Sequence, residues 1–156
     1  MKASAAAGAG TIVSVNTSRK KGQVKTPVPS AELVAGQGIR DDAHLGFAHR
    51  QVSLLMIEDI EEQKSHIAAG SSFPLGPGAF AENLTTRGID LGALEVGDEL
   101  LVRGGIRLRV SQIGKECHTK CAVFHLTGDC IMPVRGIFCA VLAGGTVRPG
   151  DAIEKR

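Results

Sequence analysis

Residues 114–130 read GKECHTKCAVFHLTGDC and hold three of the chain's four cysteines and two of its five histidines. Cysteine and histidine are the side chains that bind soft metals, and a cysteine thiolate is a strong nucleophile. The clustering therefore predicts a metal site, a redox pair, a disulfide or a nucleophilic thiol. The spacing of these residues and the rest of the sequence have to distinguish among the four.

A structural zinc site usually takes its four ligands as two closely spaced pairs. Here Cys117 and Cys121 are separated by three residues, and Cys130 follows after a longer gap, with His118 and His125 nearby. This spacing does not match a zinc ribbon, but three cysteines and a histidine leave a metal-binding module open as an alternative. The CxxC redox motif is absent, and a disulfide is not expected in a reducing compartment.

A nucleophilic thiol has more support at Cys117. Lys115, His118 and Lys120 lie close to it in the sequence, and nearby cations stabilise a thiolate, although Glu116 opposes them. We therefore predict Cys117 as the reactive residue.

The other cysteines have less reactive surroundings. Cys121 opens the apolar run CAVFHL, where it is expected to face the core or to act as a resolving thiol. Cys130 follows Asp129, whose charge disfavours a thiolate. Cys139 lies within GIFCAVL and is expected to be a core residue.

Three further polar groups could bind a ligand. RDDAHLG places Asp42 beside His44, either as a carboxylate–histidine pair or as part of a polar loop. The basic run from Arg19 to Lys25 could receive an anion, or it could be a solvated surface. FAENLTTRG offers Asn83 and Thr85 as neutral hydrogen-bonding groups.

The pattern around these residues predicts a mostly β, barrel-like domain with one or few helices. Alternating apolar residues predict strands over residues 11–18, 31–36, 51–56, 97–102 and 106–110, and a turn-linked pair made of residues 136–142 and 146–155 at the end of the chain. A helical period begins at Ile57 and could end at Gly70. Residues 26–30 are expected to be an extended loop, residues 38–50 a loop, and residues 81–86 a strand or loop edge. The 20 glycines agree with many turns.

Composition excludes several classes of protein. The 156 residues fit one domain over residues 11–156, after a short segment, residues 1–10, that is expected to be disordered. A net charge of +2 and the absence of tryptophan and tyrosine argue against nucleic-acid binding. No apolar run is long enough for a membrane span, and the first residues lack the apolar core of a signal peptide, so we expect a cytoplasmic protein.

The phrases of this sequence together resemble the MOSC domain, named for the C-terminal domain of molybdenum cofactor sulfurases, in its bacterial stand-alone form. The matching stretches are KGQVKTPV, GIRDDAHLG, HRQVSLL, PGAFAENLTTRGIDL, LEVGDELLV and residues 109–151. The resemblance covers nearly the whole chain after the first ten residues. It implies a β-barrel fold and a role in handling sulfur or the molybdenum cofactor.

The resemblance also implies roles for individual residues. Cys117 would carry a persulfide or ligate molybdenum, with Cys121 beside it. The residues expected to contact molybdopterin are Lys25, His44, Arg50, Asn83, Thr85 and His118. The chain lacks the pyridoxal-phosphate domain of the large sulfurases, so a separate cysteine desulfurase would donate the sulfur, and molybdenum cofactor or a molybdoenzyme would accept it. A reductase with Cys117 as the molybdenum ligand is a further alternative.

Two positions depart from the family pattern. Asp41 stands where the family usually has glycine before the Asp42 loop, and Ala81 replaces the usual glycine in PGAFAENLTT. Glycine at such positions serves backbone geometry, so the placement of both loops is open to test in the structure.

Overall fold

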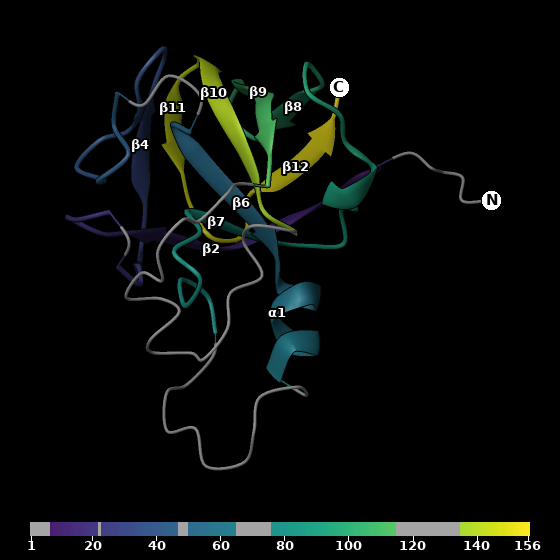
Figure 1. Cartoon of the computed structure of the whole chain (residues 1–156). Coiled ribbons are helices and arrows are strands. Elements are labelled where there is room, and N and C mark those ends of the chain that lie inside the picture. Colours follow the sequence, from purple (N-terminus) through teal and green to yellow (C-terminus); the bar gives the residue numbers. More distant parts are fainter. Residues whose placement is uncertain (1–6, 22, 47–49, 65–75, 115–134) are drawn as a thin grey trace.

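A computed structural model describes residues 7–21, 23–46, 50–64, 76–114 and 135–156. Seven strands close into a barrel, in the order β12-β8-β9-β10-β6-β7-β2 and back to β12, while β3 pairs with the C-terminal end of β2. A smaller sheet has the order β11-β4-β5. Figure 1 shows the barrel with α1 leaving it at the end of β6. The predicted mostly β, barrel-like fold is confirmed.

The described elements are short and joined by turns. The strands are β2 (Ala9–Thr17), β3 (Thr26–Val28), β4 (Ala31–Val34), β5 (Gly38–Ile39), β6 (Val52–Met56), β7 (Leu84–Arg87), β8 (Glu99–Val102), β9 (Ile106–Ile113), β10 (Ile137–Ala143), β11 (Gly145–Val147) and β12 (Ala152–Lys155). The helices are α1 (Ile57–Lys64) and the 3-10 turn η1 (Leu91–Ala93).

Alternation of side chains builds the barrel interior. Along β9, Ile106, Leu108 and Val110 are buried in the main core cluster, whereas Arg107 and Arg109 face outward. Successive side chains of a strand point to opposite faces, so one face of each strand supplies the core. The predicted inward and outward assignment of this strand is confirmed.

Helix α1 packs its apolar side against the outside of the barrel. Ile57 and Ile60 are buried in a second cluster with Leu55 of β6 and Phe80, and acidic Glu58 lies in the first turn, where the helix dipole favours it. The predicted start of the helix is confirmed, and its predicted end at residue 70 lies outside the described residues.

The structure differs from the sequence-based expectations in four places. Gly38 and Ile39, expected within a loop over residues 38–50, form strand β5, which pairs with β4. Residues 26–28 form strand β3 instead of a loop, because an edge strand tolerates Pro27, which cannot donate a hydrogen bond. The predicted pair of residues 136–142 and 146–155 does not form: β10 pairs with β9 and β6, β11 pairs with β4, and β12 closes the barrel between β8 and β2. Strand β2 begins at Ala9, and Ala7 is buried, so residues 7–10 belong to the folded domain.

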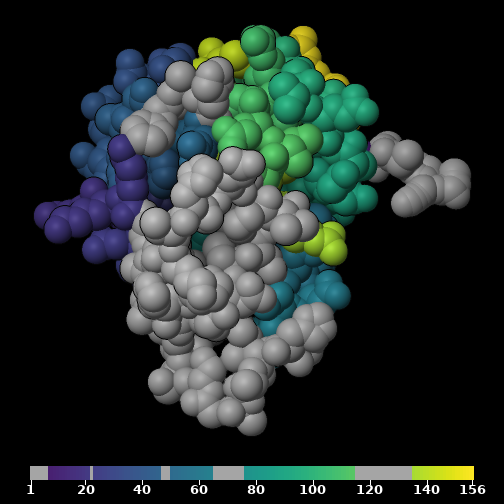
Figure 2. All heavy atoms as spheres, viewed as in Figure 1, coloured from purple at the N-terminus to yellow at the C-terminus, as the bar shows by residue number. Residues whose placement is uncertain are grey.

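In the space-filling view, the segment around residue 40 (blue) and the β8–β9 hairpin (green) lie on opposite sides of the barrel (Figure 2). Strands β6, β7 and β2 lie beside one another in the barrel. Their outer surface carries the polar side chains described next.

Candidate functional site

Five residues from neighbouring strands lie at one level across the sheet. Phe138 of β10 is opposite both Ser53 of β6 and Gln112 of β9. The row continues through Asn83, whose backbone N–H donates to Ser53 O (3.0 Å), and Asn16, whose backbone N–H donates to Asn83 O (2.7 Å). Adjacent strands are about 4.8 Å apart, so the row from Gln112 to Ser53 spans roughly 10 Å.

The polar members of this row are on the outer face of the barrel. Leu54 and Leu84, the residues that follow Ser53 and Asn83, belong to the main core cluster. Because neighbouring side chains of a strand alternate, Ser53 and Asn83 point away from that core. Both are nonetheless almost fully buried. This surface of the barrel is therefore covered by other parts of the chain.

Asn83 joins three segments through its side-chain amide. Its Nδ2 donates to Asn16 O (3.1 Å), and its Oδ1 accepts from the Ser53 backbone N–H (3.0 Å) and from Ser53 Oγ (3.2 Å). The Asn16 amide in turn donates to Thr85 Oγ1 (3.0 Å). A buried amide with paired oxygen and nitrogen fixes the relative positions of the strands that hold it.

Glu82 is a fully buried carboxylate held by hydrogen-bond donors. Its Oε2 accepts from the Gly78 backbone N–H (2.8 Å) and from Thr85 Oγ1 (2.6 Å), and its Oε1 accepts from the Phe80 backbone N–H (3.3 Å). Burial raises the pKa of Glu82, and the hydrogen bonds from Thr85 and Gly78 oppose this rise. The carboxylate therefore serves to tie the loop over residues 78–82 to strand β7.

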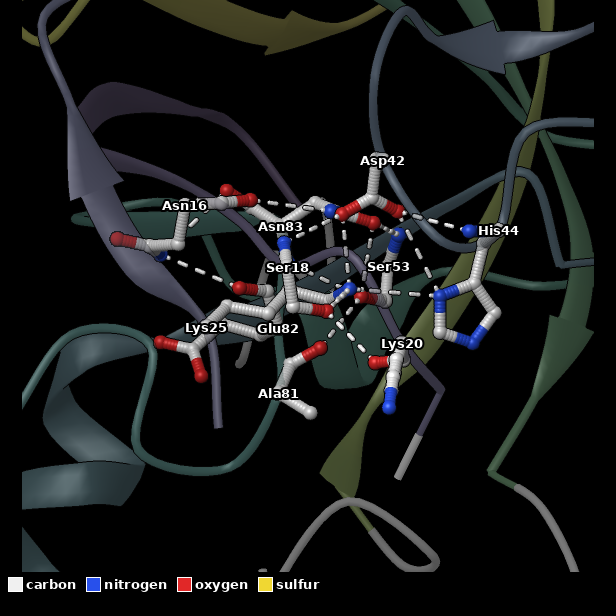
Figure 3. A network of polar contacts seen from close by, with 10 residues as sticks. All are labelled: Asn16, Ser18, Lys20, Lys25, Asp42, His44, Ser53, Ala81, Glu82 and Asn83. Carbon is white, nitrogen blue, oxygen red and sulfur yellow. Dashed lines mark hydrogen bonds and ion pairs between the residues drawn. The ribbon is translucent and has the colours of Figure 1, made fainter. Parts of the chain in front are cut away.

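A second polar group surrounds the Lys25 ammonium (Figure 3). Lys25 Nζ lies 2.9 Å from Asp42 Oδ1, donates to Ser18 Oγ (3.0 Å), and lies 3.4 Å from His44 Nδ1. Asp42 also accepts from the backbone N–H groups of Ser18 (3.0 Å, Oδ1) and His44 (3.0 Å, Oδ2). The Lys25 and Asp42 side chains are both 0% exposed, which makes this a buried ion pair.

The surroundings of Asp42 keep it ionised. Burial alone would raise the pKa of Asp42, but hydrogen bonding to His44 and the charge and hydrogen bond of Lys25 lower it well below its ordinary range. Asp42 and Lys25 are therefore opposite charges that neutralise each other inside the protein.

The two polar groups are joined through Gly78. The Lys25 backbone N–H donates to Gly78 O (2.8 Å), while the Gly78 N–H reaches Glu82. Gly78 has a φ of 87°, and a Cβ at this position would clash with Lys25 O. A side chain cannot fit there, so glycine is required for the loop to approach the Lys25 backbone.

Both departures from the family pattern lie at strained backbone positions beside the site. Asp41 has a φ of 69° and Ala81 a φ of 66°, and they are the only non-glycine residues with positive φ in the described part of the chain. This left-handed conformation disfavours residues with a Cβ. The loops thus keep a glycine-like backbone without glycine, and the strain lies next to Asp42 and Glu82.

We expect Ala81→Gly to raise the free energy of unfolding by about 0.5–1 kcal/mol. Relief of the left-handed strain exceeds the loss of one methyl group and the greater entropy of unfolded glycine. Ala35→Gly is the matched control: Ala35 is exposed and lacks positive φ, so its replacement should destabilise by a similar amount. Urea unfolding of both variants checks the sign, and equal losses in the two would contradict a strained Ala81.

The segment that contains Cys117, Cys121 and Cys130 is attached next to the row of polar residues. Ile113 of β9 is opposite Ile137 of β10, and the Gly114 N–H donates to Gly136 O (2.8 Å). Gln112 Nε2 donates to Gly114 O (2.8 Å). The paired ends of the segment, Gly114 and Gly136, are therefore two residues away from Gln112 and Phe138 along their strands.

The predicted site residues have different outcomes. Asn83 and Thr85 are buried within the network, and Lys25 and His44 meet at Asp42, which also accepts from the His44 backbone N–H as a polar loop would. Arg50 is partly exposed, three residues before Ser53. Cys117, Cys121 and His118 lie outside the described residues. Their contacts to a cofactor or metal stay predictions.

The expectation for Cys139 is confirmed. Cys139 is fully buried in the main core cluster, and burial raises the pKa of its thiol to about 12. A neutral, inaccessible thiol is not a nucleophile. Cys139 can therefore be separated from the three cysteines of residues 114–130.

Sequence reasoning missed several residues of the site. Asn16, Ser18 and Ser53 are polar residues within predicted strands that alternate apolar and polar side chains. The polar positions of such a strand normally face solvent. Glu82 carried no motif that would indicate a fully buried carboxylate. The signal that could have found it is the concentration of hydrogen-bonding residues in AENLTT directly after a glycine-rich turn.

The described residues lack both a cluster of metal ligands and a membrane-spanning helix. Within that part of the chain, histidine, cysteine, aspartate and glutamate do not gather in groups of three that could hold a metal ion. The helices described there are too short or too polar to cross a membrane.

The chain matches a family model and is similar to several solved structures. A model of the MOSC domain matches residues 41–154. The YUAD protein from Bacillus subtilis is 23% identical and covers 94% of this chain and 95% of its own, with a TM-score of 0.75. YiiM from Geobacillus stearothermophilus is 23% identical over 94% of this chain and 75% of its own, and YiiM from Escherichia coli is 19% identical over 94% and 69%, each with a TM-score of 0.70. A search of curated proteins gives no match.

Proposed function

The chain belongs to the MOSC domain family, and from this premise we propose that it is a sulfur carrier of molybdenum cofactor metabolism in which Cys117 carries the sulfur as a persulfide. The family is associated with proteins related to the molybdenum cofactor. The finer assignment rests on the cysteine chemistry of the sequence and on where the described structure attaches the cysteine-bearing segment.

The observation that carries the proposal is this point of attachment. The segment begins after Gly114, next to β10, and β10 neighbours Ser53 of the polar row. An extended chain advances at most ~3.6 Å per residue, so Cys117, three residues after Gly114, is tethered within roughly 11 Å of it. A thiol and a polar ligand site are thus joined to the same part of the barrel.

The proposed transfer is a thiol–persulfide exchange. The Cys117 thiolate attacks the outer sulfur of a persulfide on a cysteine desulfurase, the S–S bond of the donor breaks, and the donor cysteine leaves as a thiolate. A new S–S bond then holds the outer sulfur on Cys117. Persulfide sulfur is a soft nucleophile and ligand, which suits delivery to molybdenum.

The described residues fit an anionic, hydrogen-bonding ligand such as molybdopterin on one condition. Because Asp42 neutralises Lys25, the net positive charge for a phosphate has to come from another residue, and the candidate is Arg50, which is partly exposed and precedes Ser53 by three residues in the sequence. His44, whose side chain is 14% exposed, would contact the ligand directly. Asn83 and Thr85 would fix the positions of the strands behind the ligand and would not contact the ligand themselves.

The proposal also defines partners and a compartment. The sulfur donor would be a separate, pyridoxal-phosphate-dependent cysteine desulfurase, and the acceptor would be molybdenum cofactor or a molybdoenzyme that holds it. A free cysteine thiolate persists under reducing conditions, which fits the cytoplasm. Membranes and nucleic acids have no part in this scheme.

Saturable binding of purified molybdenum cofactor tests the ligand half of the proposal. Arg50→Ala should weaken binding by roughly tenfold to a hundredfold, since a charge-assisted hydrogen bond to phosphate contributes about 1.5–3 kcal/mol. Arg103→Ala is the matched control, because Arg103 is an exposed arginine in the turn between β8 and β9. No saturable binding by the unmodified protein, or equal binding by both variants, would contradict this assignment.

A further inference from the structure

We propose that a groove beside the smaller sheet is a second binding site, which takes a small zwitterion of the α-amino-acid class. The groove has a volume of about 430 Å³, within the range of about 300–1,000 Å³ that is usual for small-molecule sites. Its lining comes from the end of β2, from β3, β4 and β11, and from the turn after β5. The inference is independent of the proposed sulfur chemistry, because that scheme uses none of the lining residues.

The smaller sheet places three polar lining residues at one level. Thr146 of β11 is opposite Glu32 of β4, and the Arg40 backbone N–H donates to Glu32 O (2.9 Å), which continues the pairing of β5 with β4. Residues directly opposite each other on antiparallel strands have their side chains on the same face of the sheet. Arg40 Nε also donates to Glu32 Oε1 (2.9 Å). A hydroxyl, a carboxylate and a guanidinium therefore line the groove from one row.

Asp41 adds a second carboxylate to the groove. The hydrogen bond and the charge of Glu32 raise the pKa of Arg40, and the charge of Asp41 adds to this rise, so both carboxylates act on the same guanidinium. Asp41 stands where the family usually has glycine, and it keeps a φ of 69°. Strained residues concentrate at functional sites, and here the strained residue brings a charge into a groove.

Much of the hydrogen-bonding capacity of these side chains is unused. A guanidinium has five N–H donors, and only Nε of Arg40 has an acceptor among the described residues. In the same part of the chain, the Asp41 carboxylate lacks a hydrogen-bond donor. Three hydroxyl groups of the lining are equally open to a ligand, those of Thr17, Ser30 and Thr146. A ligand in the groove would therefore meet both free donors and free acceptors.

The charged groups of the lining determine the class of ligand. One guanidinium and two carboxylates give a net charge of −1, which disfavours a simple anion. A simple amine would pair with Asp41 and leave the free donors of Arg40 without an acceptor. A zwitterion satisfies both, because its carboxylate accepts from the planar fork of Arg40 and its ammonium donates to Asp41.

The apolar part of the lining suits a short side chain on that zwitterion. Val28 and Ala31 line the groove and pack against the main core cluster. Residues packed on a core hold their positions, so they offer a fixed apolar surface beside the charged groups. The combination of a charged row and a small apolar surface matches an α-amino acid with a short aliphatic side chain.

An NMR titration of the full-length protein with L-alanine tests the site. The backbone amide signals of residues 30–32, 40–41 and 146 should shift to saturation. Propionate lacks the ammonium group and ethylamine lacks the carboxylate, so each should bind roughly tenfold more weakly. Propionate or ethylamine binding as tightly as L-alanine would overturn the zwitterion, and L-alanine shifts that do not saturate would overturn the site.

Two variants that remove a charge locate the ligand. Asp41→Asn keeps a residue that tolerates the left-handed backbone, and Arg40→Gln keeps a polar side chain on an exposed position, so both should fold. Each should weaken L-alanine binding roughly threefold to tenfold, since these groups are partly solvated. Glu95→Gln and Arg103→Gln are the matched controls, because both residues are exposed and neither lines the groove. Folded Asp41→Asn and Arg40→Gln proteins that bind L-alanine as tightly as these controls would overturn the proposal.

Discussion

Replacement of Asp42 by alanine is expected to lower the free energy of unfolding by about 3–5 kcal/mol, which is the usual cost of removing one partner of a buried ion pair. The variant would leave the Lys25 ammonium in a water-free position, and two backbone N–H groups, those of Ser18 and His44, would lose their acceptor. Urea unfolding at neutral pH measures the loss.

A second ion pair in the same chain supplies a matched control. Glu32 and Arg40 lie 2.9 Å apart, the same distance as Asp42 and Lys25, but their side chains are 54% and 57% exposed. Exposed pairs contribute about 0–1 kcal/mol, so Glu32→Ala should cost correspondingly little. If Asp42→Ala cost no more than Glu32→Ala, burial would not be the source of the stability.

A double-mutant cycle separates the ion pair from the rest of the site. Lys25→Met should also be costly, because it strands the Asp42 carboxylate, and the double variant Lys25→Met/Asp42→Ala should lose less than the sum of the two single losses. Additive losses would mean that the two side chains stabilise the fold independently.

The lowered pKa of Asp42 gives a pH dependence with a defined sign. In the folded protein Asp42 stays ionised below its ordinary pKa of 3.8, so its stabilising contribution is fully present above that value. The contribution is lost as the pH falls below 3.8 toward the folded-state pKa. The difference in stability between the unmodified protein and Asp42→Ala should therefore shrink in this acid range.

The fold was predictable because its signals are local. The strand at residues 106–110 alternates apolar residues with arginines, and the start of α1 follows from Ile57 and Ile60. The partners of β11 and β12 were not predictable in this way. Both strands follow turns that suit a hairpin, and only closure of the barrel decides that β12 pairs with β8 and β2.

The site was predictable in its residue types and less so in their roles. Lys25, His44 and Asn83 belong to phrases typical of the family, but the sequence could not show that Asp42 neutralises Lys25. Nor could it show that Glu82 ties a loop beneath them. Such roles depend on residues far apart in the chain, such as Asn16 and Asn83, whose contact only the folded barrel creates.

Cys117→Ser is expected to abolish the loading of sulfur, the largest functional effect that the proposal implies. Serine cannot form a persulfide, and the hydroxyl is not a nucleophile toward one at neutral pH. Cys139 cannot replace Cys117, because burial in the core raises the pKa of its thiol to about 12. Since Cys117 comes after β9 and before β10 in the sequence, and is not one of the core residues described above, the serine variant should remain folded.

The mass of the intact protein after incubation with a cysteine desulfurase and cysteine tests the central claim most directly. The unmodified protein, Cys121→Ser and Cys130→Ser should each gain one sulfur atom that a reducing agent removes, and Cys117→Ser should gain none. A Cys117→Ser protein that keeps the added sulfur while Cys121→Ser loses it would contradict the assignment. Failure of the unmodified protein to gain sulfur at all would contradict sulfur carriage itself.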